Sequence, residues 1–437
     1  MSEALTRDRP RVSIVTVNLN GEEYLEDLLG SLEAQTYPSF EILLVDNGST
    51  DGSVELVQRL FPGVRVIEAG ENLGFTGGNN LGFREARGDY LALINNDTVA
   101  EPEWLSRLMG LAEGHPGVGG VGPKILFARP FVAVTLIVGP QSGRSSGAPA
   151  PRLLFSQMSG FEGCSYRKPI FESGFGAVKD LGGEVGREIE ETATLFLPVE
   201  PGAVSGRLVL RLRGLSGTRG AARSVRVAVG DTELAALEAT EEWRDSPVEV
   251  PVDLVRRSRF EVINNAGSFL EPNGRAGDRG IFEPDRGQFD AAGEVTALCG
   301  CSMLLPRRVL DEVGFFDRDL FMYYEDVELS WRIRKAGYHL WYQPASRVRH
   351  FHASTSGEGS PFFQFLVARN RILMLVRHGA WHHAIRAYLE ELYCCLRLLV
   401  NQRNPWREPL RTRLRVQASL LWRIPRACFK RWRLARP

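Results

Sequence analysis

The sequence predicts an α/β protein in which a doubly wound sheet domain is interrupted by an antiparallel β module and followed by a helical tail. Three patterns indicate this. Short runs of branched apolar residues alternate with helical periodicity over roughly residues 11–100, that periodicity disappears between residues 130 and 258, and long helical patterns run from residue 362 to the end. A chain of 437 residues is also long enough for more than one hydrophobic core.

The first part of the sheet is predicted from strands that alternate with amphipathic helices. The expected strands are Arg11–Leu19, Phe40–Val45, Val64–Glu68 and Tyr90–Ile94, and the expected helices are Glu22–Ala34, Ser53–Leu60 and Asn79–Ala86. Polar clusters follow three of these strands, at Asn18–Asn20, Asp46–Asp51 and Asn95–Asp97. Because a doubly wound sheet binds ligands at the carboxyl ends of its strands, these clusters predict a binding site.

Residues 130–258 have the pattern of an antiparallel β-sandwich, since short alternating segments are separated by Gly, Ser and Pro. The expected strands are Phe131–Val138, Thr192–Pro198, Gly206–Leu212, Ser224–Val229 and Val248–Val252, and Pro140–Pro151 has a linker-like composition. An apolar strand pattern then resumes at Glu294–Pro306, and an amphipathic helix is expected at Glu325–Ala336.

The tail is strongly basic although the whole chain has a net charge of zero. From Phe365 to Pro437, fifteen Arg and one Lys face three Glu, so the tail carries 16 − 3 = +13 and the remainder −13. Trp, Tyr, Phe and Leu are interleaved with these cations, which predicts helices that lie on an anionic membrane surface. A helical hairpin that packs on the protein or forms a homo-oligomer contact is the alternative. Nucleic-acid binding is not expected, because no nucleic-acid module accompanies the basic segment.

The N-terminus and the cysteines predict a cytoplasmic location. Met1–Pro10 is polar and lacks the apolar stretch of a signal peptide, and the six cysteines follow neither a disulfide framework nor a zinc-binding spacing. Together with the basic tail, this predicts a cytoplasmic protein that is peripheral at the inner face of the plasma membrane.

An ordered set of motifs resembles the family 2 glycosyltransferases of GT-A fold, which have a Rossmann-like, doubly wound sheet, and within them the rhamnosyltransferase-like and galactofuranosyltransferase-like members. The motifs are VTVNLN (15–20), VDNGSTDGS (45–53), ENLGFTGGNNLG (71–82), LINNDT (93–98), LCGCSMLLPR (298–307), FMYYEDVELSWR (321–332) and VRHFH (348–352). The resemblance implies a nucleotide-binding half at residues 1–129, an inserted β-sandwich at 130–258, an acceptor and catalytic half at 259–364 and a basic amphipathic tail at 365–437.

The resemblance implies an inverting transfer with two carboxylates at the catalytic centre. Asp326 corresponds to the base that deprotonates the acceptor hydroxyl, and Glu325 to a residue that binds acceptor or orients the loop. By the same resemblance, acceptor contacts are expected at Gly300, Cys301 and Trp331. The polar, glycine-bearing segment Ser354–Pro361 is expected either to close over the donor or to serve as a connector.

Donor binding is expected at the strand ends and the glycine-rich loop. The implied contacts are Val17, Asn18, Asn20, Asp46, Asn72, Gly74, Asn80, Asn96 and Asp97. Asp46 is expected to bind the nucleobase, although an Asx turn is an alternative role for its side chain. Asp51 is expected to cap the following helix or form the turn before it.

A divalent cation, Mg²⁺ or Mn²⁺, is also implied, with Asp97 and a histidine as its ligands. Asn95-Asn96-Asp97 stands at the position of the family's D-x-D-type motif but has one acid only, so donor phosphates should supply much of the coordination. His350 corresponds to the family's metal-ligating histidine. His352 is its rival, because alternate residues of a strand point the same way.

The predicted function is transfer of rhamnose or a similar hexose from a dTDP-, UDP- or GDP-sugar to a hydroxyl of a glycan or lipid-linked glycan in cell-surface polysaccharide synthesis. The alternative is a catalytically inactive carbohydrate-binding or scaffold protein. A nucleotidyltransferase is disfavoured because Asn18–Gly21 supplies no cation after the first strand.

Overall fold

The computed structural model describes residues 10–139, 153–159, 170–181, 184–200, 206–214, 223–352, 359–400 and 407–434. The chain forms two compact units. The first consists of Met1–Ala128, Ile263–Ile281 and Arg286–Pro437, and the second of Arg129–Val262 and Phe282–Asp285. The predicted linker at 140–151 and residues 354–358 of the predicted lid lie outside the described residues.

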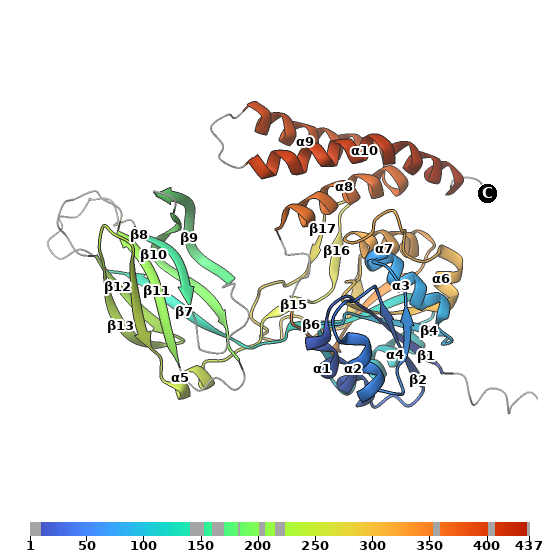
Figure 1. The fold of residues 1–437 in the computed structure, drawn as a ribbon, viewed down its shortest axis with the longest axis horizontal. Coiled ribbons are helices and arrows are strands. Elements are labelled where there is room, and N and C mark those ends of the chain that lie inside the picture. Colours follow the sequence, from blue (N-terminus) through green and yellow to red (C-terminus); the bar gives the residue numbers. More distant parts are fainter. Residues whose placement is uncertain are drawn as a thin grey trace, which may run out of the picture. The chain divides into compact units, whose positions relative to one another are not determined.

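The first unit is built on a mixed sheet with the strand order β18-β20-β6-β19-β4-β1-β2-β3, with β15 paired to β6 and β5 to β20 (Figure 1). Its strands are β1 (Val12–Asn18), β2 (Phe40–Asp46), β3 (Arg65–Glu68), β4 (Tyr90–Ile94), β5 (Thr98–Ala100), β6 (Val118–Phe127), β15 (Ile263–Asn265), β18 (Gly293–Val295), β19 (Ser302–Pro306) and β20 (His339–His350). The four predicted strands β1 to β4 are parallel to one another. β19 lies antiparallel beside β4, so the sheet as a whole is mixed.

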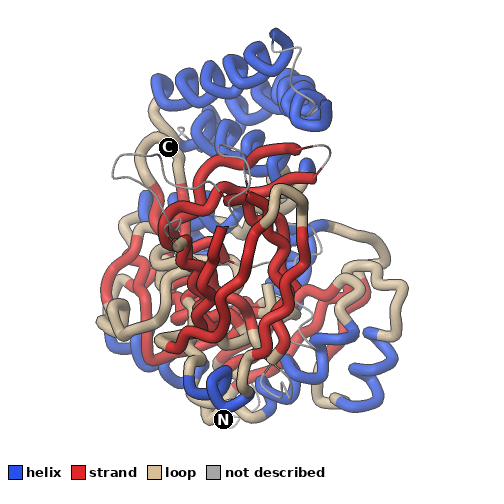
Figure 2. Tube along the Cα trace, turned by 90° about the vertical axis from the view of Figure 1, so that its left-hand side faces the viewer, coloured by secondary structure: helices blue, strands red, loops and turns tan. Residues whose placement is uncertain are grey.

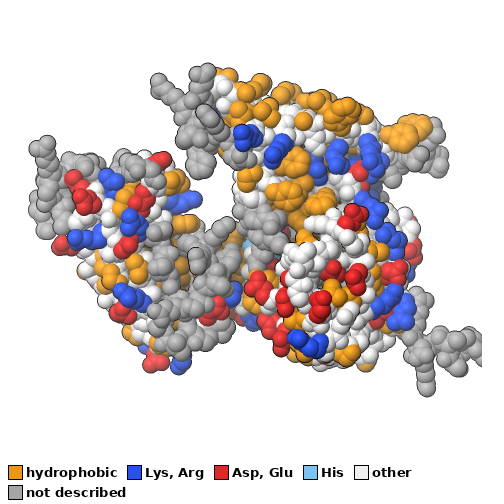
Figure 3. All heavy atoms as spheres, in the orientation of Figure 1, with side chains coloured by type: hydrophobic (Ala, Val, Ile, Leu, Met, Phe, Trp, Pro, Cys, Tyr) orange, Lys and Arg blue, Asp and Glu red, His pale blue; other side chains and the backbone are white. Residues whose placement is uncertain are grey.

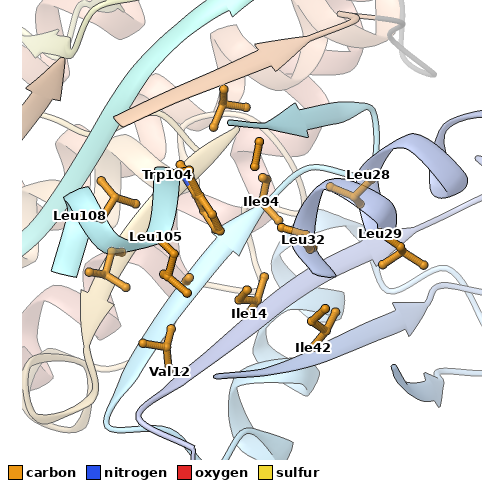
Figure 4. Packing of buried hydrophobic residues seen from close by; sticks show 14 of the residues in the cluster. Val12, Ile14, Leu28, Leu29, Leu32, Ile42, Ile94, Trp104, Leu105 and Leu108 are labelled. Carbon is orange, nitrogen blue, oxygen red and sulfur yellow. The ribbon is translucent and has the colours of Figure 1, made fainter. Parts of the chain in front are cut away.

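Helices cover both faces of this sheet, as the doubly wound prediction requires. They are α1 (Glu22–Glu33), α2 (Ser53–Leu60), α3 (Gly74–Glu85), α4 (Trp104–Gly114), α6 (Arg307–Val313) and α7 (Glu325–Lys335). Val12 and Ile14 of β1 point into a core with α1 and α4, shown in Figure 4, whereas Val15 packs on the opposite face with α3, α6 and α7. Each leucine buried in these cores contributes about 1.5–3 kcal/mol of transfer free energy. The predicted fold class is therefore confirmed.

Helix α3 begins at Gly74, five residues before the predicted helix start at Asn79. The glycine-rich segment is thus helical and mostly buried, because its small residues let the helix approach the sheet closely. A Cβ at Gly82 would meet Val15 at 2.4 Å, and one at Gly78 would meet Val17 at 2.8 Å. Helical periodicity cannot detect such a segment, since its buried face consists of glycine instead of large apolar residues.

The second unit is an antiparallel sheet of β7 (Phe131–Val138), β8 (Leu153–Ser159), β9 (Ile170–Leu181), β10 (Glu184–Pro198), β11 (Arg207–Gly214), β12 (Arg223–Val229), β13 (Thr232–Ala239) and β14 (Arg244–Glu249). The strands form one hydrogen-bonded path instead of two separate sheets, because the long β10 pairs with β7 through its second half and with β8 through its first. Side chains from both ends of the path share one core. The expected strand at Val248–Val252 is wrong in part, since β14 ends at Glu249 and the short helix α5 (Val252–Arg257) follows.

The tail forms three helices, α8 (Pro361–His378), α9 (Trp381–Val400) and α10 (Arg407–Leu434), which lie side by side in Figures 1 and 2. Their inward faces share an apolar cluster that includes Leu320 of the loop before α7. This bears out packing on the protein, the alternative considered for the tail. Among the described residues, no helix is both long and apolar enough to cross a membrane.

Candidate active site

The polar residues at the ends of β1, β2 and β4 lie next to one another. Asn18 is fully buried at the end of β1, where its amide donates to Ser49 Oγ at 3.1 Å and its carbonyl accepts from Asn96 Nδ2 at 2.9 Å. Asn20 has a φ of 51° and accepts from the backbone N–H of Thr50 at 2.7 Å. These amides join three chain segments into one polar edge of the sheet, at the place where the sequence predicts the donor.

Asp46 divides its two carboxylate oxygens between two environments. Oδ2 accepts from the backbone N–H groups of Gly48 and Ser49 at 3.2 and 3.1 Å, which is the Asx turn considered as an alternative. Oδ1 is buried and has no hydrogen-bond partner within the protein. A buried acceptor without a donor is costly. The Asx turn therefore uses one oxygen of Asp46 and leaves the other without a donor in the protein, and the nucleobase contact stays a prediction.

Two asparagines of the glycine-rich segment form hydrogen bonds within the protein. Asn72 Oδ1 accepts from Gly74 N at 2.9 Å and lies 3.3 Å from Asn47 Nδ2, so it shapes the turn before α3. Asn80 is buried, and its side chain donates to and accepts from the backbone of Phe316. Both ends of the Asn80 amide are occupied within the protein. Asn80 therefore has a structural role in the protein, and its expected donor contact stays a prediction.

Asp97 and His350 form a buried pair on neighbouring segments. The His350 Nε2 atom lies 3.2 Å from Asp97 Oδ1, and its Nδ1 atom lies 3.2 Å from Asn264 Oδ1. In the tautomer that donates through Nδ1 to Asn264, the Nε2 lone pair would point toward Asp97, and an acceptor at the second ring nitrogen is the usual second-shell arrangement of a metal ligand. Two ligands about 3 Å apart also fit one cation with bonds of about 2.1 Å. The residues present therefore fit a divalent cation.

His352 differs from His350 because β20 ends between them. The strand stops at His350, and His352 has a φ of 51°, so the two residues do not alternate as they would along one strand. His352 Nδ1 lies 3.5 Å from Asn264 Nδ2. Within the described part of the chain, no cluster of three or more His, Cys, Asp or Glu side chains could hold a metal ion. A cation at Asp97 and His350 would therefore need further ligands, which the donor phosphates would supply.

Asp326 stands at the start of α7 against the loop that precedes β19. Its Oδ2 atom accepts from Gly300 N at 2.8 Å, and its Oδ1 atom accepts from Val327 N at 2.7 Å. The same loop bonds to the end of β4, because Cys301 O accepts from Asn95 N at 2.9 Å. One short loop therefore links the Asp326 carboxylate to the segment that carries Asp97.

Burial sets the protonation of the two adjacent carboxyl groups. Desolvation raises the pKa of Asp326 to about 6, although the backbone N–H groups of Gly300 and Val327 oppose it and the charge of Asp278 adds to it. Desolvation, with the neighbouring charge of Asp326, raises the pKa of Glu325 well above its usual range. Two backbone N–H groups favour the charged form of Asp326, whereas burial keeps Glu325 neutral. Asp326 can therefore accept a proton while Glu325 keeps its own. Asp326, which is partly exposed, is the group poised to accept a proton near neutral pH.

The turn before Asp326 is strained and is held by α8. Phe321, Tyr323 and Tyr324 have φ values of 68°, 64° and 69°, which bulky residues adopt only when their surroundings impose it. The buried amide of Asn370 donates to the carbonyls of Leu320, Met322 and Tyr323 at 3.0, 2.9 and 2.7 Å. Asn370 is thus a positioning residue for the turn that presents Asp326.

We expect Asn370→Ala to lower the free energy of unfolding by about 2 kcal/mol or more, because buried carbonyls lose their donor. We also expect kcat to fall on the order of 10- to 100-fold as the turn relaxes and Asp326 moves. Thermal unfolding and steady-state kinetics measure both effects. Gln364→Ala is the matched control, since that amide lies on the same helix and donates only to Gly359 O in an exposed position. Normal kcat in a destabilised Asn370→Ala protein would show that the turn does not depend on this side chain.

The expected acceptor contacts lie in two different places. Gly300 and Cys301 belong to the loop beside Asp326, and a Cβ at Gly300 would lie 3.3 Å from Asp326 Oδ2. Trp331 instead packs against the apolar cluster of α8 to α10. Its expected acceptor contact stays a prediction.

Sequence analysis missed the residues that support the site from a distance. Asn264 orients His350 across 86 positions of sequence, and Asn265 binds Asp278 at 2.6 Å near the carboxylates. The polar pair Asn264-Asn265 directly after Val262-Ile263 was the available signal, since both asparagines are buried where a strand would ordinarily hold apolar residues. Nothing in the spacing identifies their partners.

Comparison with known proteins places the chain in a family. The model of "Glycosyl transferase family 2" matches residues 13–129, and that of "Glycosyltransferase like family 2" matches residues 261–371. An uncharacterized glycosyltransferase of Haemophilus influenzae is 29% identical over 116 residues, 26% of this chain and 36% of the relative. The O-antigen biosynthesis protein RfbC of Myxococcus xanthus is 38% identical over 125 residues, and glycosyltransferase AglE of Haloferax volcanii is 30% identical over 131. These matches cover 28% and 29% of this chain and 10% and 43% of those relatives.

Two solved structures show a distant likeness. GalNAc-T7 with UDP, GalNAc and Mn²⁺ has a TM-score of 0.44 at 14% identity, with 94% of this chain and 55% of that chain covered. The mannosyltransferase PcManGT from Pyrobaculum calidifontis in complex with GDP-Man and Mn²⁺ has a TM-score of 0.39 at 15% identity, with 95% and 76% covered.

The chain spans less than half the length of each curated relative named above. Because the two family matches fall on the two segments that together form the large sheet and its carboxylate site, the chain belongs to the family 2 glycosyltransferases.

Proposed function

We propose that the protein transfers a sugar, rhamnose or a similar hexose, from a nucleotide-sugar to a hydroxyl of a glycan or lipid-linked glycan with inversion at the anomeric carbon. The observation that carries this proposal is the Asp326 carboxylate, which is held by Gly300 and Val327 and has its pKa raised to about 6. The name of the O-antigen relative supports an acceptor in cell-surface polysaccharide synthesis. A lipid-linked acceptor would be met at the cytoplasmic membrane surface, where we propose the enzyme works.

In the proposed reaction, Asp326 accepts the proton of the acceptor hydroxyl while that oxygen forms a bond to the anomeric carbon. The bond from the anomeric carbon to the phosphate oxygen breaks on the opposite face, and the nucleoside diphosphate leaves with the bonding electrons. Asp46 Oδ1 and the amides at the end of β1 would bind the donor's nucleoside. A divalent cation held by Asp97 and His350 would neutralise charge on the leaving diphosphate.

The domain roles follow from the same proposal. Residues 1–129 would bind the nucleotide and residues 259–364 would bind the acceptor and supply the base. The loop at Gly300 and Cys301 joins these two halves, because Cys301 O accepts from Asn95 N and Gly300 N donates to the Asp326 carboxylate. The inserted residues 130–258 and the tail would then act outside the chemical step.

The experiment that tests the function is release of nucleotide by the purified full-length protein from dTDP-rhamnose, UDP-galactofuranose and a panel of UDP- and GDP-sugars. Each donor is measured with and without glycan acceptors, since acceptor-dependent release of one nucleotide identifies a transferase. The stereochemistry of the product is then read by NMR. Donor binding without release under any acceptor would favour the alternative, a catalytically inactive carbohydrate-binding protein.

The proposed base also predicts the pH dependence of transfer. Below pH 6 the Asp326 carboxyl is protonated and cannot accept a proton, so kcat/KM should fall about tenfold per pH unit. About one pH unit above this pKa the rate should level off, because the carboxylate is then almost fully formed. Initial rates between pH 4.5 and 8, with circular dichroism to verify folding, measure this limb. A rate that stays constant from pH 5 to 7.5 would exclude Asp326 as the base.

A further inference from the structure

The outward faces of α9 and α10 carry most of the large apolar side chains that are exposed in the described part of the chain. Of the eighteen large apolar side chains that are exposed among the described residues, twelve lie on these two helices. On α9 they are Trp381, Ile385, Leu389, Tyr393, Leu396, Leu399 and Val400, and on α10 they are Leu414, Leu421, Trp422, Phe429 and Trp432. We call this set the apolar ridge. Figure 3 shows apolar side chains gathered over α9 and α10.

The apolar ridge is one face of each helix and not a scatter of positions. Residues 381, 385, 389, 393, 396 and 400 follow the three- and four-residue spacing of a single helical face, and the buried Ala384, Ala387, Glu391 and Cys395 lie on the other. α10 is divided in the same way, since Val416, Leu420 and Ala427 are buried while Leu421 and Trp422 are 71% and 85% exposed. Both helices therefore pack with one apolar face and expose a second one.

The net charge of the tail does not show which of its cations are buried against the protein and which are exposed. Seven of them are buried or half-buried and bind groups of the protein: Arg369, Arg371, Arg377, Arg413, Arg423, Lys430 and Arg431. Arg377 and Lys430, for example, both pair with Asp317 and Asp319 in the loop before α7. Much of the +13 charge thus joins the three helices to one another and to the loop before α7, and these cations are occupied within the protein.

The charges that remain exposed beside the apolar ridge are all positive. Every exposed Asp, Glu, Lys or Arg that the structure describes on α9 and α10 is an arginine, namely Arg386, Arg397, Arg411, Arg415 and Arg426. Two of these also form ion pairs, Arg386 with Glu390 at 3.1 Å and Arg426 with Asp319 at 3.4 Å. A second copy of the chain docked through this face would bring like charges together. An anionic bilayer accepts the arginines at its phosphates, the Trp and Tyr rings at the headgroup level and the Leu side chains below them.

We propose that the apolar ridge is a membrane-docking surface that inserts into the headgroup region of an anionic bilayer, with insertion of apolar side chains as its main attachment and the five arginines as a supplement. The sequence predicts attachment through basic residues together with aromatic and apolar side chains, and the present proposal assigns the larger part to the apolar ridge. It deepens the proposed function, on which it rests for the lipid-linked acceptor. Vesicle binding needs no sugar donor, so either proposal can fail without the other.

The test is co-sedimentation of the full-length protein with vesicles of phosphatidylcholine containing 30% phosphatidylglycerol. The variant Leu421→Ser/Trp422→Ser removes two of the most exposed side chains of the apolar ridge, and Leu60→Ser, at 44% exposure on α2, is the matched control. We expect the double variant to bind about tenfold more weakly, and the control to bind as the native protein does. Raising salt from 0.1 to 0.5 M should weaken native binding only a few-fold, because apolar insertion is not screened. Unchanged circular dichroism verifies folding of each variant.

Three outcomes would overturn the proposal. Equal binding by the native protein and the double variant would exclude the apolar ridge as the contact. Complete loss of binding at 0.5 M salt would show that charge alone holds the protein to the vesicle. No vesicle binding, together with a dimer in light scattering that Leu421→Ser/Trp422→Ser dissociates, would identify a second copy of the chain as the occupant.

Discussion

Asp326→Asn is expected to lower kcat by about three orders of magnitude while donor binding stays nearly unchanged. General-base catalysis by a positioned side chain typically contributes 10²- to 10⁴-fold, and an amide cannot accept the hydroxyl proton. The substituted side chain keeps an oxygen that can accept from Gly300 N, so the loop should keep its position. Single-turnover rates and the KM for the donor measure the effect, and loss in kcat without loss in affinity identifies a group that acts in the chemical step.

Two variants separate the carboxylates at the start of α7. Because burial keeps the proton on Glu325, the neutral Glu325→Gln variant should lose less than tenfold in kcat. Asp311→Asn, an exposed carboxylate on α6, controls for the loss of one negative charge. If Glu325→Gln were inactive and Asp326→Asn active, the base would be Glu325, and the assignment of roles would be reversed.

The elements of the sheet were predictable because local periodicity and tertiary packing agree there. β4 and α2 have the predicted bounds, since branched apolar runs and a clear amphipathic helix are flanked by turn residues. The start of α3 and the structural role of Asn80 could not be predicted from the sequence. Both depend on segments whose backbones come close together in the fold, and no local sequence pattern encodes such contacts. The placement of polar residues at strand ends followed from topology alone.

The hydrogen bonds that support the site from a distance could not be predicted from the sequence, for a different reason. Asn264 and Asn370 act on groups that are far away in sequence, and their partners are a histidine ring and three backbone carbonyls. Backbone carbonyls occur at every position, so nothing in the sequence marks those that a distant amide will bind. The tail shows the same limit, because charge counting cannot tell Arg377, which is buried against Asp317, from Arg397, which is exposed.

Asp97→Ala and chelation are both expected to abolish transfer, since the leaving diphosphate would lose its counter-charge. Removal of one electrostatic stabiliser of a transition state typically costs about 10²- to 10³-fold in kcat. Turnover should stop in EDTA and return on addition of Mn²⁺ or Mg²⁺. Binding of Mn²⁺ in the presence of a nucleoside diphosphate, followed by electron paramagnetic resonance, should weaken in Asp97→Ala independently of any activity.

His350 and His352 provide a test variant and its matched control for the prediction on Mn²⁺ binding. His350→Ala should weaken Mn²⁺ binding as Asp97→Ala does, because Nε2 of His350 lies 3.2 Å from the Asp97 carboxylate. His352→Ala should weaken Mn²⁺ binding less than His350→Ala does, since β20 ends before His352 and its ring contacts Asn264, Phe127 and the edge of the His350 ring. Metal binding that is lost in His352→Ala but kept in His350→Ala would reassign the ligand. Full activity in EDTA would remove the cation from the reaction, and the Asp97 and His350 pair would then be structural: a buried carboxylate and imidazole that join the end of β4 to the end of β20.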